Sequence, residues 1–221
     1  MRLAERLKQL DSGMKHQVGA EKHNTVRIAG AACTANFLLG TGKLLMGIFS
    51  LSFFTIMNAL YTYGMVAAKF CALKGIAVPV KKQYAYYRRA AGILIASSLC
   101  YAIYSTRLLW HPQSTKYHPY LAMGIATVTF AEIGLNLWGV LVERKNKSLT
   151  FHALKTVNLA SSLIGLVLTQ AALLSFTHTE ADYDPSRANG ILGLCMGGCA
   201  ALLGSFMLWR AARLEQKEEV S

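Results

Sequence analysis

Hydrophobic residues in this chain gather into six long segments separated by short polar connections. Each segment reaches or slightly exceeds the roughly 20 residues that an α-helix needs to cross a hydrocarbon core of about 30 Å. A membrane β-barrel would instead show segments of about ten residues with alternating polarity, and no such alternation is present. The pattern predicts an all-α membrane protein, a bundle of six transmembrane helices. The segments cover residues 28–49, 53–73, 90–110, 119–142, 150–176 and 190–209.

The composition supports lipid as the solvent in which the chain folds. Of 221 residues, 53% are hydrophobic and only 15% are charged, with a mean hydropathy of +0.33, which is high for a soluble domain. The formal net charge of +12 would suggest a nucleic-acid partner in a soluble protein. Here the basic residues border the apolar segments, where they contact anionic head groups, so we expect the lipid bilayer as partner and no nucleic acid.

The distribution of Lys and Arg predicts the orientation. Seventeen of the 23 basic residues precede the first segment or follow the second, fourth and sixth, whereas three lie in the alternate connections. Connections rich in Lys and Arg are retained on the cytoplasmic side, so both termini are expected there. The expected location is the plasma (inner) membrane. We expect a basic amphipathic segment at 1–27, the six-helix domain at 28–210 and a cytoplasmic tail at 211–221.

Motifs of soluble catalysis are missing from the sequence. It has no Gly-rich phosphate loop followed by Lys, no His-Glu-x-x-His and no Gly-x-Ser-x-Gly. The apolar segments also supply no convergent nucleophile and base. We therefore expect neither an enzyme nor a cofactor, and an intramembrane enzyme is the least favoured hypothesis.

Several short patterns resemble one transporter family in order along the chain. Asn36, Lys43, Gly47 and Ser52 match its Asn, Lys, Gly, Ser series, and Asn136 stands where its fourth span carries Asn. The run YAYYRRAAGIL is similar to its Tyr-x-Tyr-x-Arg pattern, and NLASSLIGLVL resembles its Asp-x-Leu-Thr-Ser-x-Gly-Val run. Over nearly its whole length the chain thus resembles the cation diffusion facilitator (cation efflux) family.

The resemblance implies a metal site that this sequence does not reproduce. The family places two ligands four residues apart on the second span and two on the fifth; the corresponding residues here are Tyr61, Met65, Leu154 and Asn158. None is the His or Asp of a zinc site, and Asn58 replaces the family's neighbouring Asp. We expect no metal, and no cytoplasmic metal-binding domain, because only about a dozen residues follow the last segment.

Polar residues remain inside the apolar segments. Glu132 is the only acid within a segment, and at about 1.5 Å per residue it lies about 20 Å from the outer end. On the same scale Lys69 lies at about 25 Å and Lys43 at about 10 Å, so Lys69 is the expected partner of Glu132. Asn136 lies one turn from Glu132 on the same helix face.

These polar groups allow two interpretations. In one, Glu132 relays a proton or cation along a polar path formed by the remaining candidates. In the other, Glu132 and a lysine form a structural ion pair, and the asparagines hydrogen-bond between helices and fix their register. The candidate pathway comprises Asn36, Lys43, Asn58, Tyr61, Glu132, Asn136 and Asn158.

The last segment carries a row of small residues, beginning at Gly190 and continuing at three- and four-residue spacing. Such a face lets another helix approach closely. That helix belongs either to the same chain or to a second copy, and the family resemblance favours a homodimer. The expected dimer contacts are Gly193, Gly197, Ala201 and Gly204.

Two functions follow from these expectations. The first is a transporter of a cation or another small solute through an altered site. The alternative is a non-transporting relative that acts as a membrane partner or regulator. An aqueous cavity that reaches Asn58 and Asn158 from one side favours transport, whereas dry packing of both favours the alternative.

Overall fold

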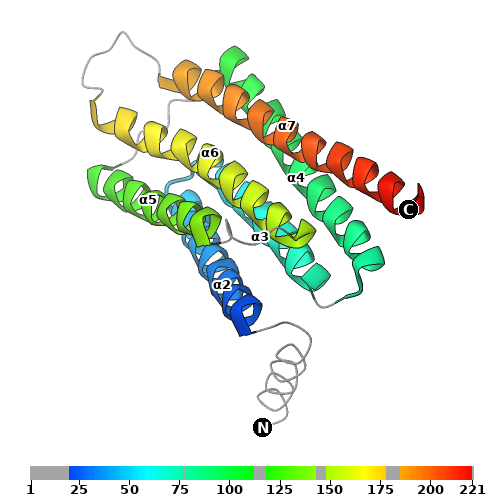
Figure 1. Cartoon of the computed structure of the whole chain (residues 1–221). Helices are drawn as coiled ribbons and strands as arrows, with labels where there is room; N and C mark the ends of the chain where they lie inside the picture. The colour runs from blue at the N-terminus through cyan, green and yellow to red at the C-terminus, as the bar shows by residue number, and fades with distance from the viewer. Residues whose placement is uncertain (1–19, 77, 112–117, 143–147, 178–184, 221) are drawn as a thin grey trace.

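The computed structural model is all α-helical in the part of the chain that it describes, residues 20–76, 78–111, 118–142, 148–177 and 185–220. Every predicted apolar segment corresponds to one helix (Figure 1). The predicted basic segment lies outside the described residues up to position 19. The helices are α2 (Ala20–Phe49), α3 (Phe53–Ile76), α4 (Val80–Trp110), α5 (Pro119–Val142), α6 (Leu149–Thr177) and α7 (Pro185–Val220).

Five of the six described helices are long and apolar enough to cross a membrane, and α3 is not among them. The polar residues of α3 account for this difference, since it carries Asn58, Thr62 and Lys69 within 24 residues. All three side chains are buried inside the bundle. The polar residues of α3 therefore face the interior of the bundle.

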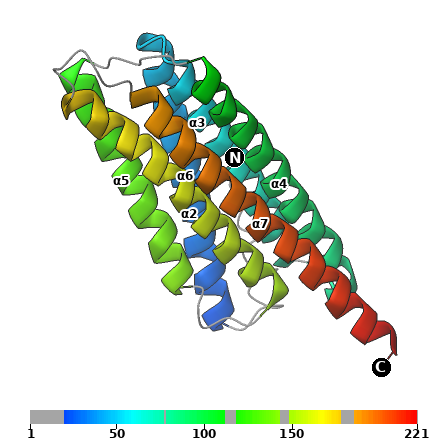
Figure 2. The ribbon, with the colours of Figure 1, turned by 90° about the horizontal axis from the view of Figure 1, so that it is seen from above.

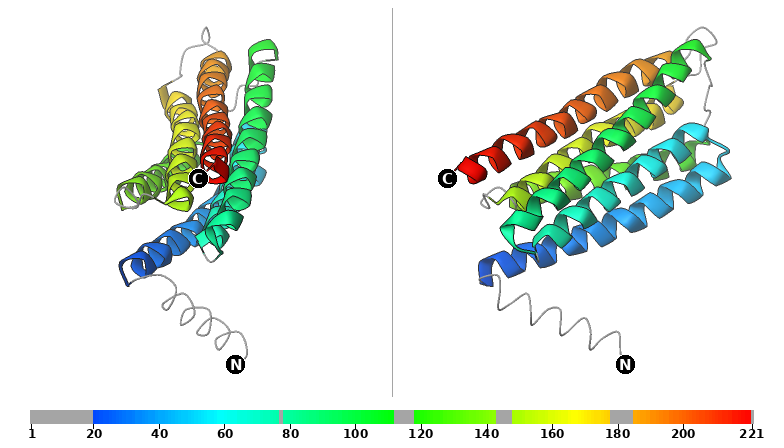
Figure 3. Two further views of the ribbon diagram at one scale, coloured as in Figure 1. Left: turned by 45° about the vertical axis from the view of Figure 1, so that its right-hand side comes forward. Right: turned by 90° about the vertical axis from the view of Figure 1, so that its right-hand side faces the viewer.

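The helices run up and down beside one another (Figure 2). Helix α4 packs most extensively on α7, and α5 packs on α6. Helix α3 contacts α2, α4 and α6, so its polar face meets several neighbours. The beginning of α2 and the end of α7 lie at the same end of the bundle (Figure 3), as an even number of antiparallel helices requires.

Large apolar side chains cover the outside of the bundle. Every described helix exposes at least one that is about half accessible or more, an arrangement that is costly in water and favourable in lipid. The bundle therefore has the surface of a membrane-embedded protein. Representatives are Leu38, Leu60, Ile103, Phe130, Leu173 and Leu202.

The small-residue face of α7 packs against α4 of the same chain. A Cβ atom added to Gly193 would lie 2.4 Å from the Ser105 hydroxyl oxygen, and one added to Gly197 would lie 3.3 Å from the Ala102 Cβ. The prediction that Gly193, Gly197, Ala201 and Gly204 form a dimer interface therefore needs correction, because the glycines contact α4. Dimerisation stays a prediction and would need another face.

Helix α7 also crosses the predicted boundary between the membrane domain and the tail. It continues without a break from Pro185 to Val220, well beyond residue 210. Its last turns leave the apolar segment and carry charged residues, among them Arg210 and Arg213. The guanidinium of Arg213 lies 4.1 Å from the centre of the Trp209 ring, a cation–π contact of the kind that favours basic residues at an interfacial aromatic.

Candidate functional site

Five polar side chains meet inside the bundle, where α2, α3, α5 and α6 come together. Glu132 and Lys43 are each 1% exposed, and the other three are at most 2% exposed. We call this set the central polar cluster. Its members are Lys43, Asn58, Thr62, Glu132 and Ser161.

Lys43 and Glu132 form a buried ion pair through Nζ and Oε2. The Lys43 ammonium also donates to Asn58 Oδ1 at 3.1 Å and to Thr62 Oγ1 at 3.5 Å. The expectation that Lys69 pairs with Glu132 is therefore wrong. The expectation was based only on the depth of each residue along its helix. Which groups meet also depends on which helices are neighbours and on how far the long lysine side chain reaches.

The second carboxylate oxygen of Glu132 faces two hydroxyl groups. Ser161 donates to Oε1 at 3.2 Å, and the Thr62 hydroxyl lies 3.4 Å from the same atom. The Thr62 hydroxyl also lies 3.0 Å from the backbone carbonyl oxygen of Asn58. A hydroxyl has one hydrogen, so it donates to one of these acceptors at a time. Both carboxylate oxygens are thus satisfied, as burial of a charge requires.

The α2–α3 hairpin brings Lys43 opposite Asn58 and Thr62. The three residues between the helices are 50–52, so positions 43 and 58 lie at similar distances from the turn. Close packing is possible because Gly47 has no side chain: a Cβ atom there would lie 3.0 Å from the backbone nitrogen of Ile56. The short connection and this glycine set the register that places the ammonium against the amide oxygen.

A second set of buried polar groups lies next to the central polar cluster. Asn36 Nδ2 donates to Asn136 Oδ1 at 2.8 Å, and Lys69 Nζ donates to the same oxygen at 2.6 Å. Asn136 is one helical turn from Glu132 on α5, so the two sets are adjacent. The structure therefore unites Asn36 and Asn136 by a hydrogen bond between helices, which both interpretations allow, and adds Lys69 to them.

Tyr61 and Asn158 have separate contacts. The Tyr61 hydroxyl donates to the Ala160 carbonyl oxygen of α6 at 3.3 Å. Asn158 packs on α5, where a Cβ atom added to Gly139 would lie 2.4 Å from its amide nitrogen. These two residues connect helices beside the cluster.

Thr62 and Ser161 are members of the site that were not among the predicted site residues. Thr62 follows Asn58 by four residues and Ser161 follows Asn158 by three, so each shares a helix face with a predicted site residue. Hydroxyl groups are common in membrane helices and usually bond to their own backbone. Helical periodicity was therefore the one signal that could have identified them.

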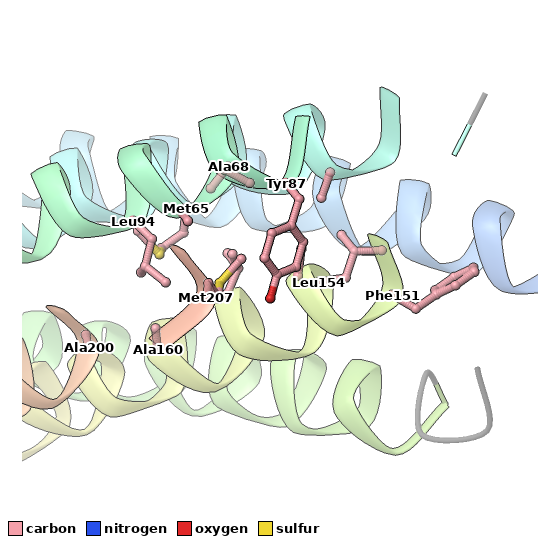
Figure 4. Close-up of a cluster of buried hydrophobic side chains, with 14 of the residues drawn as sticks. Met65, Ala68, Tyr87, Leu94, Phe151, Leu154, Ala160, Ala200 and Met207 are labelled. Atoms are coloured by element: carbon pink, nitrogen blue, oxygen red, sulfur yellow. The ribbon is translucent and has the colours of Figure 1, made fainter. Parts of the chain in front are cut away.

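The positions that correspond to metal ligands in the resembled family lie in apolar surroundings. Helices α3 and α6 do pack together, which brings these positions close. Met65 and Leu154 are fully buried in the large hydrophobic cluster, where Figure 4 shows them among other apolar side chains. Among the described residues, no group of three or more His, Cys, Asp or Glu could hold a metal ion. The structure offers oxygen donors around a single carboxylate instead.

Asn58 and Asn158 are both enclosed, with exposures of 1% and 4%. One cavity of about 380 Å³ lies between α3 and α4. Tyr61 is the member of the predicted polar pathway that lines it. Its other lining residues are mostly apolar, including Met57, Leu60 and Tyr101. None of the five members of the central polar cluster lines this cavity, and their side chains are only 1% to 2% exposed.

No protein-family model matches the chain, and no curated protein matches it.

Proposed function

We propose that this chain is an integral membrane transporter of a small cation and that the central polar cluster is its ion site. The observation that carries the proposal is the fully buried Lys43–Glu132 pair, surrounded by amide and hydroxyl oxygens from α3 and α6. A carboxylate with neutral oxygen donors is the usual chemistry for holding a hard cation. Within the apolar segments Glu132 is the only acid. Binding of the cation therefore depends on its carboxylate.

The cost of burying charge supports a functional role for the pair. Each ionisable residue near the bilayer centre costs roughly 2.5 to 3.5 kcal/mol on insertion scales, and such residues usually mark ion or proton pathways. Register between helices needs no charge, because a hydrogen bond between Asn36 and Asn136 already connects α2 with α5. Retaining both an acid and an amine in lipid therefore favours transport over a purely structural pair.

The proposal includes six transmembrane helices with both termini in the cytoplasm. Helix α3 has the same length as α5, 24 residues, and its polar face is buried, so lipid meets only its apolar side. Basic residues such as Arg27, Lys82 and Arg213 belong to the end at which α2 begins and α7 finishes. The positive-inside rule assigns this end to the cytoplasm, and the plasma (inner) membrane is the proposed location.

Ion flux into proteoliposomes tests the proposal. The purified wild-type chain is assayed with Na⁺, K⁺, Mn²⁺ and Zn²⁺. The isosteric variant Glu132→Gln is assayed in the same way. We expect flux of at least one cation in the wild type and at least a tenfold loss in the variant, because Gln keeps the size of the side chain and one acceptor oxygen but removes the charge.

Glu215→Gln is the matched control. Glu215 is a partly exposed acid on the last turns of α7 that pairs with Arg88 at 3.3 Å, far from the central polar cluster in sequence and environment. This variant should transport at the wild-type rate. Equal flux in wild type and Glu132→Gln, or none in either, would count against the proposal.

The enclosed positions of Asn58 and Asn158 favour a second candidate, a non-transporting membrane partner. In a transporter these asparagines become accessible to water during the cycle, whereas in a partner protein they stay dry. Asn158→Cys, placed in a chain whose native cysteines are replaced by Ala, distinguishes the two. Labelling by a membrane-impermeant thiol reagent supports transport, and complete protection together with absent flux supports the partner.

A further inference from the structure

We propose that the Lys43 ammonium is a built-in competitor of the transported ion and that the site exchanges one proton for one monovalent cation. The inference rests on the proposed function and adds the substrate class and the coupling. It starts from the position of the amine. The Lys43 nitrogen occupies the point toward which Glu132 Oε2, Asn58 Oδ1 and Thr62 Oγ1 converge. These three oxygens are the donors that an alkali cation would use.

The charge of the site sets the charge of the ion. Glu132 is the only acid that belongs to an apolar segment, so the cluster balances one positive charge. Burying a second, uncompensated charge in a low-dielectric interior is strongly unfavourable. A divalent cation would leave such a charge beside Lys43 and Lys69, whereas a monovalent cation matches the carboxylate.

Lys43 and a cation cannot hold Glu132 at the same time while both are charged. The Lys43 side chain is almost completely enclosed, at 1% exposure, so a displaced ammonium would become an unpaired charge inside lipid. Loss of its proton removes that charge, because lysine can become a neutral amine. The balanced step is Lys43–NH₃⁺ with Glu132–COO⁻ plus M⁺ giving Lys43–NH₂ with Glu132–COO⁻·M⁺ plus H⁺.

Other titratable groups face this region from the neighbouring helices. Tyr61 and Lys69 approach from α3, and Cys33 approaches from α2. Tyr61 donates to the Ala160 carbonyl, Lys69 donates to Asn136, and the Cys33 thiol lies 3.8 Å from the Val66 carbonyl oxygen. Lys43 is the titratable group that bonds directly to Glu132, so the exchanged proton is assigned to it.

Two substitutions of Lys43 give opposite expected results. Lys43→Gln removes the competing charge, so the carboxylate should accept Na⁺ without releasing a proton. Lys43→Arg keeps the charge in a side chain that stays protonated, so it should remain on Glu132 and block the cation. Lys74→Gln is the matched control, because Lys74 is exposed on α3 and lies over the Phe70 ring.

The experiment uses proteoliposomes that contain a pH-sensitive dye and an inward Na⁺ gradient. In the wild type and in Lys74→Gln, Na⁺ entry should make the interior alkaline with one proton leaving per Na⁺, at a rate that an imposed membrane potential does not change. Lys43→Gln should admit Na⁺ without a pH change, at a rate that follows the potential. In Lys43→Arg the Na⁺ flux should fall at least tenfold.

A binding measurement on the wild type alone makes the inference independent of the variants' folding. Adding Na⁺ to the detergent-solubilised chain in weak buffer should release one proton per bound ion. The apparent Na⁺ affinity should rise about tenfold per pH unit while the competitor is protonated.

The possible failures are distinguishable. Cation flux that requires Glu132 but releases no proton, or that remains proton-coupled in Lys43→Gln, overturns this inference and leaves the proposed function standing. Transport of Zn²⁺ in preference to Na⁺ also overturns it. Absence of all cation flux overturns the proposed function, and the inference with it.

Discussion

Replacing Lys43 and Glu132 singly and together measures how strongly their pairing stabilises the bundle. Removing one partner of a buried ion pair costs about 3 to 5 kcal/mol, because the other charge is left uncompensated. Both residues keep neutral partners here: Ser161 still donates to Glu132, and Asn58 still accepts from Lys43. The expected cost of Lys43→Met or Glu132→Gln is therefore at the lower end, about 3 kcal/mol each.

The double variant should be far less unstable than the sum of the two single variants. With both charges removed, no uncompensated charge remains, and replacement of a buried pair by neutral groups is often close to neutral in stability. We expect a cost below about 2 kcal/mol, which gives a coupling energy of at least about 4 kcal/mol in the double-mutant cycle. A variant whose free energy of unfolding is lower by about 3 kcal/mol should melt about 6 to 12 °C lower for a chain of this size.

Reversible unfolding in detergent by denaturant provides the assay, with thermal melting as a second readout. The Arg88–Glu215 pair is the control cycle, because its side chains are 52% and 38% exposed and such pairs couple by at most about 1 kcal/mol. Additive effects at Lys43 and Glu132, with coupling below about 1 kcal/mol, would refute the reasoning. The pair would then be hydrated or uncharged.

Two further predictions concern helix packing and topology. Gly193→Ala should destabilise the chain by about 1 to 3 kcal/mol, because its Cβ would lie 2.4 Å from the Ser105 hydroxyl oxygen; Gly198→Ala has open space at the same helix and should be neutral or slightly stabilising, as unfolding curves of both would show. Reporter fusions test the proposed topology: green fluorescent protein at either end should fluoresce and alkaline phosphatase there should be inactive, and the reverse result at either end would contradict it.

The helices were predictable because each depends on a local property of the chain. Residues 119–142 are apolar apart from a few polar positions such as Glu132 and Asn136, and α5 has the same bounds, Pro119–Val142. The predicted segment 53–73 was also found as a helix, although α3 carries several polar residues. A helix satisfies its own backbone hydrogen bonds, so in lipid any long apolar run favours it. Boundaries differed where charged residues extend the helix beyond the apolar run, as in α7.

The partners of the polar residues were less predictable. Asn36, Lys43, Asn58, Glu132 and Asn136 were recognised as buried polar groups and do lie together in the structure. The choice between Lys43 and Lys69 as partner of Glu132 depends on which helices are neighbours and how far each lysine reaches. Position along a helix carries neither piece of information. The glycine face of α7 was open to the same ambiguity, since a smooth face does not identify the helix that covers it.

The sequence by itself determined the solvent and the number of apolar segments, and it located the residues whose charge needs compensation. These properties follow from hydropathy and from the cost of isolated charges in lipid, which are local. Tertiary structure alone decided that Lys43 neutralises Glu132, that Ser161 completes the carboxylate's hydrogen bonds and that α4 covers the glycines of α7. Each of these depends on contacts between helices distant in sequence, which only the packing of the whole bundle specifies.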